Sequence, residues 1–374
     1  MVAPEGGTTN RGAPVAYEPR AQRVLFGAGV AGSALTDAVA RIGGGRVMLI
    51  AGPSEATTAR QLASGVDVEA MFFEIEPHVP VEVAEDARST AFTADVDVLV
   101  AVGGGSTIGV AKAVALRSGL PIVAIPTTFA GSEATDVWGL TEGGRKVNGT
   151  DPLVLPKSVI YDPELVVSLP SHIRVASGLN AIAHCVDSLW GPSATPISTA
   201  LVVEGLRELA THLGAAKDRA DDLAALAGCQ SGTYLAAAGF AATGSGMHHK
   251  ICHVLGGAYG LQHAATHAVL LPHVLGFNGP AAPDAERRIA SALRDAGYGD
   301  GTDALAGLLN LYDALDAPRD LGSLGLGEEQ VSEAAALALE KIPPSNPRTV
   351  TLDDVVGILT RAQSGAAPVR VPLT

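Results

Sequence analysis

The chain has 374 residues, and its 47% hydrophobic content is enough for a large core and favours two domains over one. Its formal net charge of −14 argues against a nucleic-acid-binding protein, because nucleic acids are bound by positive surfaces. Only three scattered cysteines, no long apolar run and no signal-peptide pattern predict a cytoplasmic protein without disulfides or a membrane span.

The first part of the sequence alternates short β-rich runs with helical segments. Residues 1–22 are rich in Gly, Pro and Thr and are predicted to form a flexible tail. Strands are expected at residues 23–27, 46–51, 96–102 and 121–126 and near 72–75, with helices at 33–42 and in the Ala-rich run that ends at residue 117. This alternation predicts a Rossmann-like parallel sheet with crossover helices over residues 23–163.

The second part of the sequence has the period of helices almost throughout. Its Ala-rich runs, residues 201–214 and 222–242, show no alternation typical of strands. Residues 164–374 are therefore predicted to form an all-helical domain, which would be the catalytic one, with the boundary near residues 162–166.

A glycine turn follows the strand predicted at residues 96–102. Gly103, Gly104, Gly105 and Ser106 open the next helix, and glycines there let backbone N–H groups approach phosphate oxygens. The turn matches neither the G-x-G-x-x-G fingerprint nor a Walker loop, so alone it is weak. Thr127 and Thr128 close the following strand at the same sheet edge, which favours a bound dinucleotide.

Histidines are concentrated in one stretch, residues 246–273, which holds six of the ten in the chain. His249 and His253 are four residues apart and share a helix face, as do Asn180 and His184 in an earlier segment. With His263, these side chains could converge on a metal ion or form proton donors for an oxyanion. The other three are expected to be structural or supporting residues: His248, His267 and His273.

These motifs together resemble the iron-containing (group III) alcohol dehydrogenases from about residue 23 to the end of the chain. The resemblance is carried by V-G-G-G-S at 102–106, P-T-T at 126–128 and the spaced histidines. Within that family, H-K-I-C-H-V-L-G-G at 249–257 and L-N-A-I-A-H-C at 179–185 are similar to the maleylacetate reductase branch.

The resemblance implies a site in the cleft between the two domains, and it alone implies the following roles by position. Six residues would hold NADH or NADPH: Gly103, Gly104, Gly105, Ser106, Thr127 and Thr128. Lys146 would reach the cofactor ribose, and His253 would lie beside the nicotinamide. Four residues match the family's metal-ligand positions: Asn180, His184, His249 and His263. A homodimer is implied as well.

Three positions depart from the family pattern. Asn180 stands where metal-binding members carry Asp, so we expect at most a weak zinc or iron site that catalysis does not require. The segment 127–133 is one residue shorter than usual. Gly52 falls where many members place an Asp that binds the ribose hydroxyls, so we expect only modest discrimination between NADH and NADPH.

The resemblance implies NAD(P)H-dependent reduction of maleylacetate, a small dicarboxylate, to 3-oxoadipate in the degradation of aromatic compounds. Lys250 and Arg145 could bind its carboxylates, although a solvated surface charge explains each equally well. Three alternatives stay open: a metal-dependent alcohol or polyol dehydrogenase of the same family, a dehydroquinate-synthase-like lyase, and a sensor without catalysis. Asn180 argues against the first, and the dense histidines argue against the third. The second would need more acidic and basic residues in the cleft than the sequence offers.

Overall fold

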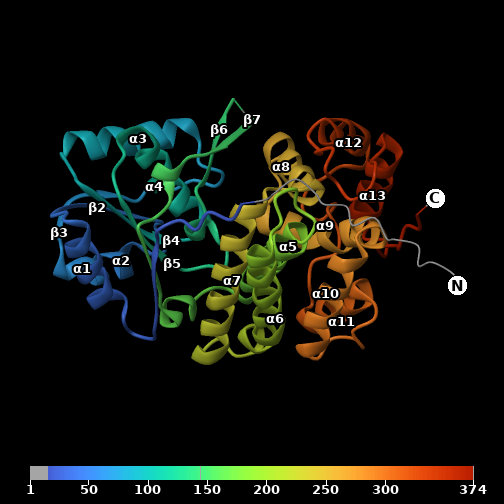
Figure 1. The fold of residues 1–374 in the computed structure, drawn as a ribbon. Coiled ribbons are helices and arrows are strands. Elements are labelled where there is room, and N and C mark those ends of the chain that lie inside the picture. Colours follow the sequence, from blue (N-terminus) through green and yellow to red (C-terminus); the bar gives the residue numbers. More distant parts are fainter. Residues whose placement is uncertain (1–15, 144, 374) are drawn as a thin grey trace, which may run out of the picture.

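The computed structural model describes residues 16–143 and 145–373. Figure 1 shows a sheet-containing N-terminal part beside a helical C-terminal part, as the sequence predicted. None of the described helices is both long and apolar enough to cross a membrane.

The predicted flexible tail, residues 1–22, lies mostly outside the described residues. Its last residues make specific contacts. Arg20 forms an ion pair with the buried Asp136, and the side chain of Gln22 donates a hydrogen bond of 2.9 Å to the carbonyl oxygen of Glu133. These contacts hold the end of the segment against the α/β part of the molecule.

Six parallel strands form the main sheet, in the order β1-β8-β5-β4-β2-β3. They are β1 (Arg23–Phe26), β2 (Arg46–Ala51), β3 (Asp67–Phe72), β4 (Val98–Gly103), β5 (Ile122–Pro126) and β8 (Ser158–Tyr161). A separate antiparallel hairpin consists of β6 (Val137–Glu142) and β7 (Arg145–Thr150). Strands β4 and β5 are buried along their whole length, as apolar strands of a parallel sheet are.

The sequence analysis predicted the parallel sheet correctly but missed part of it. Strand β8 has only four residues, S-V-I-Y, and the hairpin strands are partly exposed and carry few apolar residues in alternation. The strand expected near residues 72–75 is β3, which ends at Phe72. Short or half-exposed strands give little periodic signal, so these errors have a common cause.

Helices cover both faces of the sheet. They are α1 (Ala31–Ile42), α2 (Ala56–Leu62), α3 (Val81–Thr93) and α4 (Gly105–Ser118). Val47 and Leu49 of β2 pack in one cluster with α1 and α2, while Met48 and Ile50 pack in another with α3 and α4. The helices that follow β2 and β4 therefore lie on opposite faces, and in open α/β sheets ligands bind at the carboxyl ends of strands where this change of face occurs.

Residues 164–373 are all described and contain no strand, as predicted. Their helices are α5 (Ser171–Ser188), α6 (Pro196–Asp218), α7 (Leu223–Thr243), α8 (Met247–Tyr259), α9 (His263–Asn278), α10 (Pro283–Asp295), α11 (Ala304–Leu315), α12 (Val331–Leu339) and α13 (Leu352–Ser364). The predicted domain boundary falls between the end of β8 and the start of α5.

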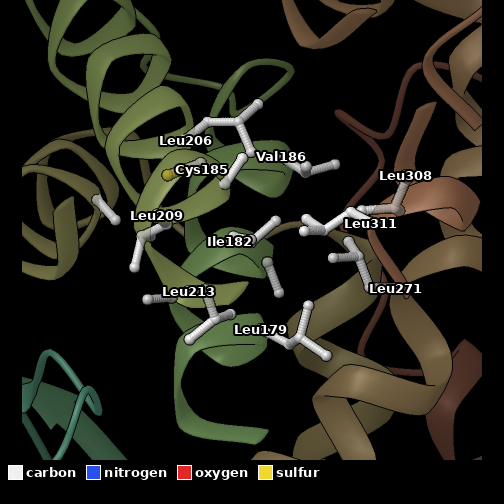
Figure 2. Close-up of a cluster of buried hydrophobic side chains, with 14 of the residues drawn as sticks. Leu179, Ile182, Cys185, Val186, Leu206, Leu209, Leu213, Leu271, Leu308 and Leu311 are labelled. Carbon is white, nitrogen blue, oxygen red and sulfur yellow. The ribbon is translucent and has the colours of Figure 1, made fainter. Parts of the chain in front are cut away.

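Helix α5 runs through the core of the helical part. Figure 2 shows Leu179, Ile182 and Val186 of this helix among leucines of α6, α9 and α11. Full burial of each such side chain contributes about 1.5–3 kcal/mol, so the apolar face fixes the rotation of the helix. Asn180 and His184 lie on another face of α5, where the same packing holds them in place.

Candidate active site

The glycine turn after β4 has the close backbone packing that a phosphate site needs. Gly103 has a φ of +156°, and a Cβ on it would stand 2.4 Å from Oγ1 of Thr107. A Cβ on Gly104 would stand 3.0 Å from the Thr128 side chain. Helix α4 starts at Gly105, so its free N–H groups and positive end border this turn.

The two predicted parts of the cofactor site lie together in the structure. Gly103 and Pro126 are paired across β4 and β5, and the N–H of Thr127 donates to the carbonyl oxygen of Gly103 at 3.1 Å. Lys146 lies on β7, and its predicted contact with the ribose stays a prediction.

The histidines predicted to converge are brought together from three helices. His184 of α5 and His249 of α8 stack with ring centroids 5.1 Å apart. His253 follows on α8 at 6.2 Å from His249, and His263, the first residue of α9, stacks on His253 at 6.4 Å. We call His184, His249, His253 and His263 the histidine cluster. The i, i+4 spacing and the start of α9 thus place these four rings as the sequence indicated.

His267 lies closer to this cluster than the sequence analysis expected. Its ring centroid is 4.4 Å from that of His263 and 4.7 Å from that of His249. The fully buried His248 forms a hydrogen bond with His267, with 2.9 Å between its Nε2 and Nδ1 of His267. Sγ of Cys252 lies 3.8 Å from the same Nε2. His267 is four residues after His263, and this helical spacing is the signal that could have identified it.

Asp187 is a site residue that sequence reasoning missed. Its fully buried carboxylate lies 2.7 Å from Nδ1 of His249 and accepts hydrogen bonds from the N–H of Gly246 at 2.8 Å and from Nε1 of Trp190 at 3.0 Å. A carboxylate only accepts, so Nδ1 of His249 carries the proton and Nε2 presents a lone pair. The only available signal was its place on the helix of His184, three residues later.

The loop after β5 connects the glycine turn with the histidine cluster. The carbonyl oxygen of Ala130 accepts a 3.5 Å hydrogen bond from Asn180, and a Cβ on Gly131 would stand 3.6 Å from Nδ1 of His184. Buried Lys112 of α4 fixes the next residues by donating to the carbonyl oxygens of Ser132, Thr135 and Val137 at 2.6, 2.8 and 2.8 Å. The cofactor turn and the histidines are therefore neighbours.

The buried imidazoles are neutral near pH 7. Loss of hydration lowers the pKa of His184 to about 4 and that of His248 to about 3. The pKa values of His249 and His267 lie well below the usual 6.5 for the same reason. Each neutral ring offers one N–H and one lone pair, and that of His249 is committed to Asp187. An oxyanion would have to receive its N–H group from another ring of the histidine cluster.

Three of the four predicted metal-ligand positions offer a buried atom that could bind a metal ion, whereas the described ligand atoms that lie within 4.8 Å of one another belong to His248, Cys252 and His267. The three atoms at the predicted positions have no hydrogen-bond partner among the described residues: Asn180 Oδ1, His184 Nδ1 and His249 Nε2. The Asp187–His249 pair has the arrangement that orients metal-binding histidines. An amide oxygen and three imidazoles suit zinc or iron, although the missing carboxylate weakens binding.

Comparisons with known proteins agree with this geometry. The family models for iron-containing alcohol dehydrogenase match residues 21–163 and, for the C-terminal part, residues 174–363. A maleylacetate reductase of Sphingobium indicum is 40% identical, over 94% of this chain and 98% of its own. The crystal structure of an iron-containing alcohol dehydrogenase from Corynebacterium glutamicum has 47% identity and a TM-score of 0.91, covering 96% of this chain and 99% of its own.

The maleylacetate reductase of Agrobacterium tumefaciens also has this fold. Its crystal structure is 37% identical, with a TM-score of 0.88, and the match covers 95% of this chain and all of its own. A family named for iron gives no support to the expectation that catalysis proceeds without a metal. The matches cover nearly the whole chain at identities well above 30%. The chain therefore belongs to the iron-containing alcohol dehydrogenase family and is an oxidoreductase.

Proposed function

We propose that the protein is a maleylacetate reductase, which uses NADH or NADPH to reduce maleylacetate to 3-oxoadipate in the degradation of aromatic compounds. The carrying observation is the convergence of four histidine rings beside a glycine turn at the carboxyl edge of a parallel sheet. The curated relatives at about 40% identity that bear this name support the choice of substrate.

The reaction needs a hydride at the alkene of the conjugated system and a stabilised negative charge on its ketone oxygen. The hydride forms a C–H bond at the alkene carbon β to the ketone, and the π electrons move to the ketone oxygen as an enolate. A proton then adds to the carbon next to the ketone, which restores the C=O bond. The nicotinamide ring loses the two electrons of the hydride, and the alkene gains them.

Residues of this chain would bind the cofactor, orient its nicotinamide and stabilise the enolate oxygen. The turn at Gly103–Ser106, with Thr127 and Thr128, would hold the cofactor pyrophosphate at the start of α4. His253 has its ring 6.2 Å from that of His249 and 6.4 Å from that of His263, and it would face the nicotinamide of a bound cofactor. Imidazole N–H groups stabilise the enolate oxygen, which is a large effect in a site that excludes water.

A metal, when bound, would be held by Asn180, His184, His249 and His263 and would supply a Lewis acid. Asp187 prepares His249 for this role by holding its proton on Nδ1. Lys250 of α8 is partly buried and follows His249 in the sequence, and its predicted role in binding a substrate carboxylate stays a prediction, as does that of Arg145. The predicted homodimer and cytoplasmic location stay predictions.

A second candidate is an alcohol dehydrogenase of the same family. The unpartnered atoms of Asn180, His184 and His249 favour it, because they fit the metal on which such an enzyme would rely. The test is oxidation of NADH and of NADPH with maleylacetate, beside a panel of short aldehydes and ketones. Maleylacetate is expected to give the highest kcat/KM by at least about a hundredfold, roughly 3 kcal/mol. Turnover of simple aldehydes alone would contradict the proposal.

A further inference from the structure

The carboxyl ends of β2 and β4 are the expected place for the adenosine half of the cofactor, because the helices after these neighbouring strands lie on opposite faces of the sheet. The glycine turn Gly103–Gly105 closes β4, and β2 is its neighbour in the sheet. In folds of this kind, a dinucleotide with its pyrophosphate at such a turn has its adenosine ribose at the carboxyl end of the neighbouring strand. That end is Ala51, followed by Gly52. Residue 52 has no side chain with which to contact a ribose.

A carboxylate from further along the chain fills the space that a side chain at residue 52 would occupy. A Cβ on Gly52 would stand only 2.6 Å from Oε2 of Glu55. The backbone turns back on itself here, since the N–H of Glu55 donates to the carbonyl oxygen of Gly52 at 3.1 Å. The hydroxyl of Ser54 donates to the same Oε2 at 2.7 Å and holds the carboxylate in this position.

Two further carboxylates follow the strand next to β2 at this edge of the sheet, and the cation of α2 is engaged elsewhere. The guanidinium of Arg60, the cation of α2, stacks 4.5 Å over the ring of Phe73 and is engaged there. Glu74 and Glu76 are exposed and follow β3, the other neighbour of β2, at the same edge of the sheet. A phosphate dianion placed at this edge would meet repulsion, while ribose hydroxyls would find an acceptor.

We propose that Glu55 recognises the adenosine ribose and gives the enzyme a preference for NADH over NADPH. Its carboxylate accepts hydrogen bonds from the 2′- and 3′-hydroxyls of NADH and repels the 2′-phosphate of NADPH. This assignment rests on the proposed use of a nicotinamide cofactor, and it does not depend on the identity of the second substrate. The sequence-based expectation of modest discrimination took account of Gly52 alone.

The test compares Glu55→Gln with the wild-type enzyme in two measurements. The first is the dissociation constant of each reduced cofactor, followed by its fluorescence without any second substrate. The second is kcat/KM for each cofactor with maleylacetate at about 0.15 M ionic strength. The ratio of NADH to NADPH is expected to fall about 10- to 100-fold in both, because one or more hydrogen bonds to a charged acceptor are lost. Glu69→Gln, an exposed glutamate within β3, is the control and should leave the ratio unchanged.

A double variant that moves the carboxylate from residue 55 to residue 52 makes the test stricter. In Gly52→Asp combined with Glu55→Ala, a carboxylate returns to the same space from residue 52, and the preference for NADH should return with it. A ratio that stays within about twofold of wild type in Glu55→Gln would overturn the assignment. If NADH binding weakens in this variant but maleylacetate is not reduced by any form, Glu55 keeps its role and the proposed substrate is wrong.

Discussion

Replacing Asp187 with Asn is the sharpest structural perturbation of the site. The carboxylate accepts from Gly246 and Trp190 and lies 2.7 Å from Nδ1 of His249, in a fully buried position. Asn has the same shape, but its NH₂ group would face one of these three N–H donors. At least one charge-assisted hydrogen bond, of about 1.5–3 kcal/mol, is lost and a buried donor is left unpaired. We therefore expect Asp187→Asn to lower the free energy of unfolding by about 2–4 kcal/mol.

The catalytic effect follows from the tautomer of His249. Without the negative charge of the carboxylate, the proton is held less strongly on Nδ1, so Nε2 presents its lone pair in a smaller fraction of the molecules. We expect kcat to fall about 10- to 100-fold, the usual effect of removing the residue that orients a site histidine. The dissociation constant of NADH should stay near the wild-type value, because the glycine turn is not touched.

Asp162→Asn is the matched control for this prediction. Asp162 is equally buried, and it accepts hydrogen bonds from the backbone N–H groups of Gly29, Ala31 and Glu164 at 3.0–3.1 Å. This variant should lose stability to a similar degree in urea unfolding while kcat stays near wild type. If Asp187→Asn kept the wild-type kcat, or if both variants lost kcat equally, the role given to Asp187 would be refuted.

Three further predictions follow from the site and from one buried histidine outside it. His253→Ala should lower kcat strongly with little change in cofactor affinity, because the ring lies among the histidines and not at the glycine turn; unchanged kcat would reduce it to packing. Asn180→Asp should tighten zinc binding in a chelator competition assay, since an ionised ligand replaces a neutral amide; equal affinities would contradict the ligand assignment. Burial lowers the pKa of His273 to about 4, so the folded state resists its protonation, and stability present above pH 6.5 is lost as the pH falls toward 4. His273→Gln should reduce this loss by up to about 3 kcal/mol in urea titrations at stepped pH, and an identical pH dependence would show that the residue does not titrate as described.

Helical spacing accounts for most of what the sequence revealed about the site. His249 and His253 had to share a face of α8, and the glycines at 103–105 had to follow an apolar strand, so local rules sufficed. Asp187 could not be found in this way. Its partners, Gly246 and His249, are about sixty residues away, and only the packing of α8 against α5 brings them to it.

Turn geometry and burial explain why the sequence did not reveal the positions of Glu55, His267 and strand β8. Glu55 reaches the space beside Gly52 only because the chain reverses between them, and no periodic pattern reports such a reversal. His267 was assigned a structural role because one buried histidine is usually packing. Its ring lies 4.4 Å from that of His263 because α9 starts at the cluster and its first two turns face it. Strand β8 is too short to show alternation.

The position of a transferred hydrogen tests the central claim most directly. As a maleylacetate reductase, the enzyme would reduce the conjugated alkene of maleylacetate and leave its ketone intact. With NADH deuterated at the transferring position, the product should be 3-oxoadipate with one deuterium on the carbon β to the ketone, located by mass spectrometry and NMR. A hydroxy acid that keeps the alkene and has deuterium on its carbinol carbon would contradict the account, because the chain would then act as an alcohol dehydrogenase on this substrate.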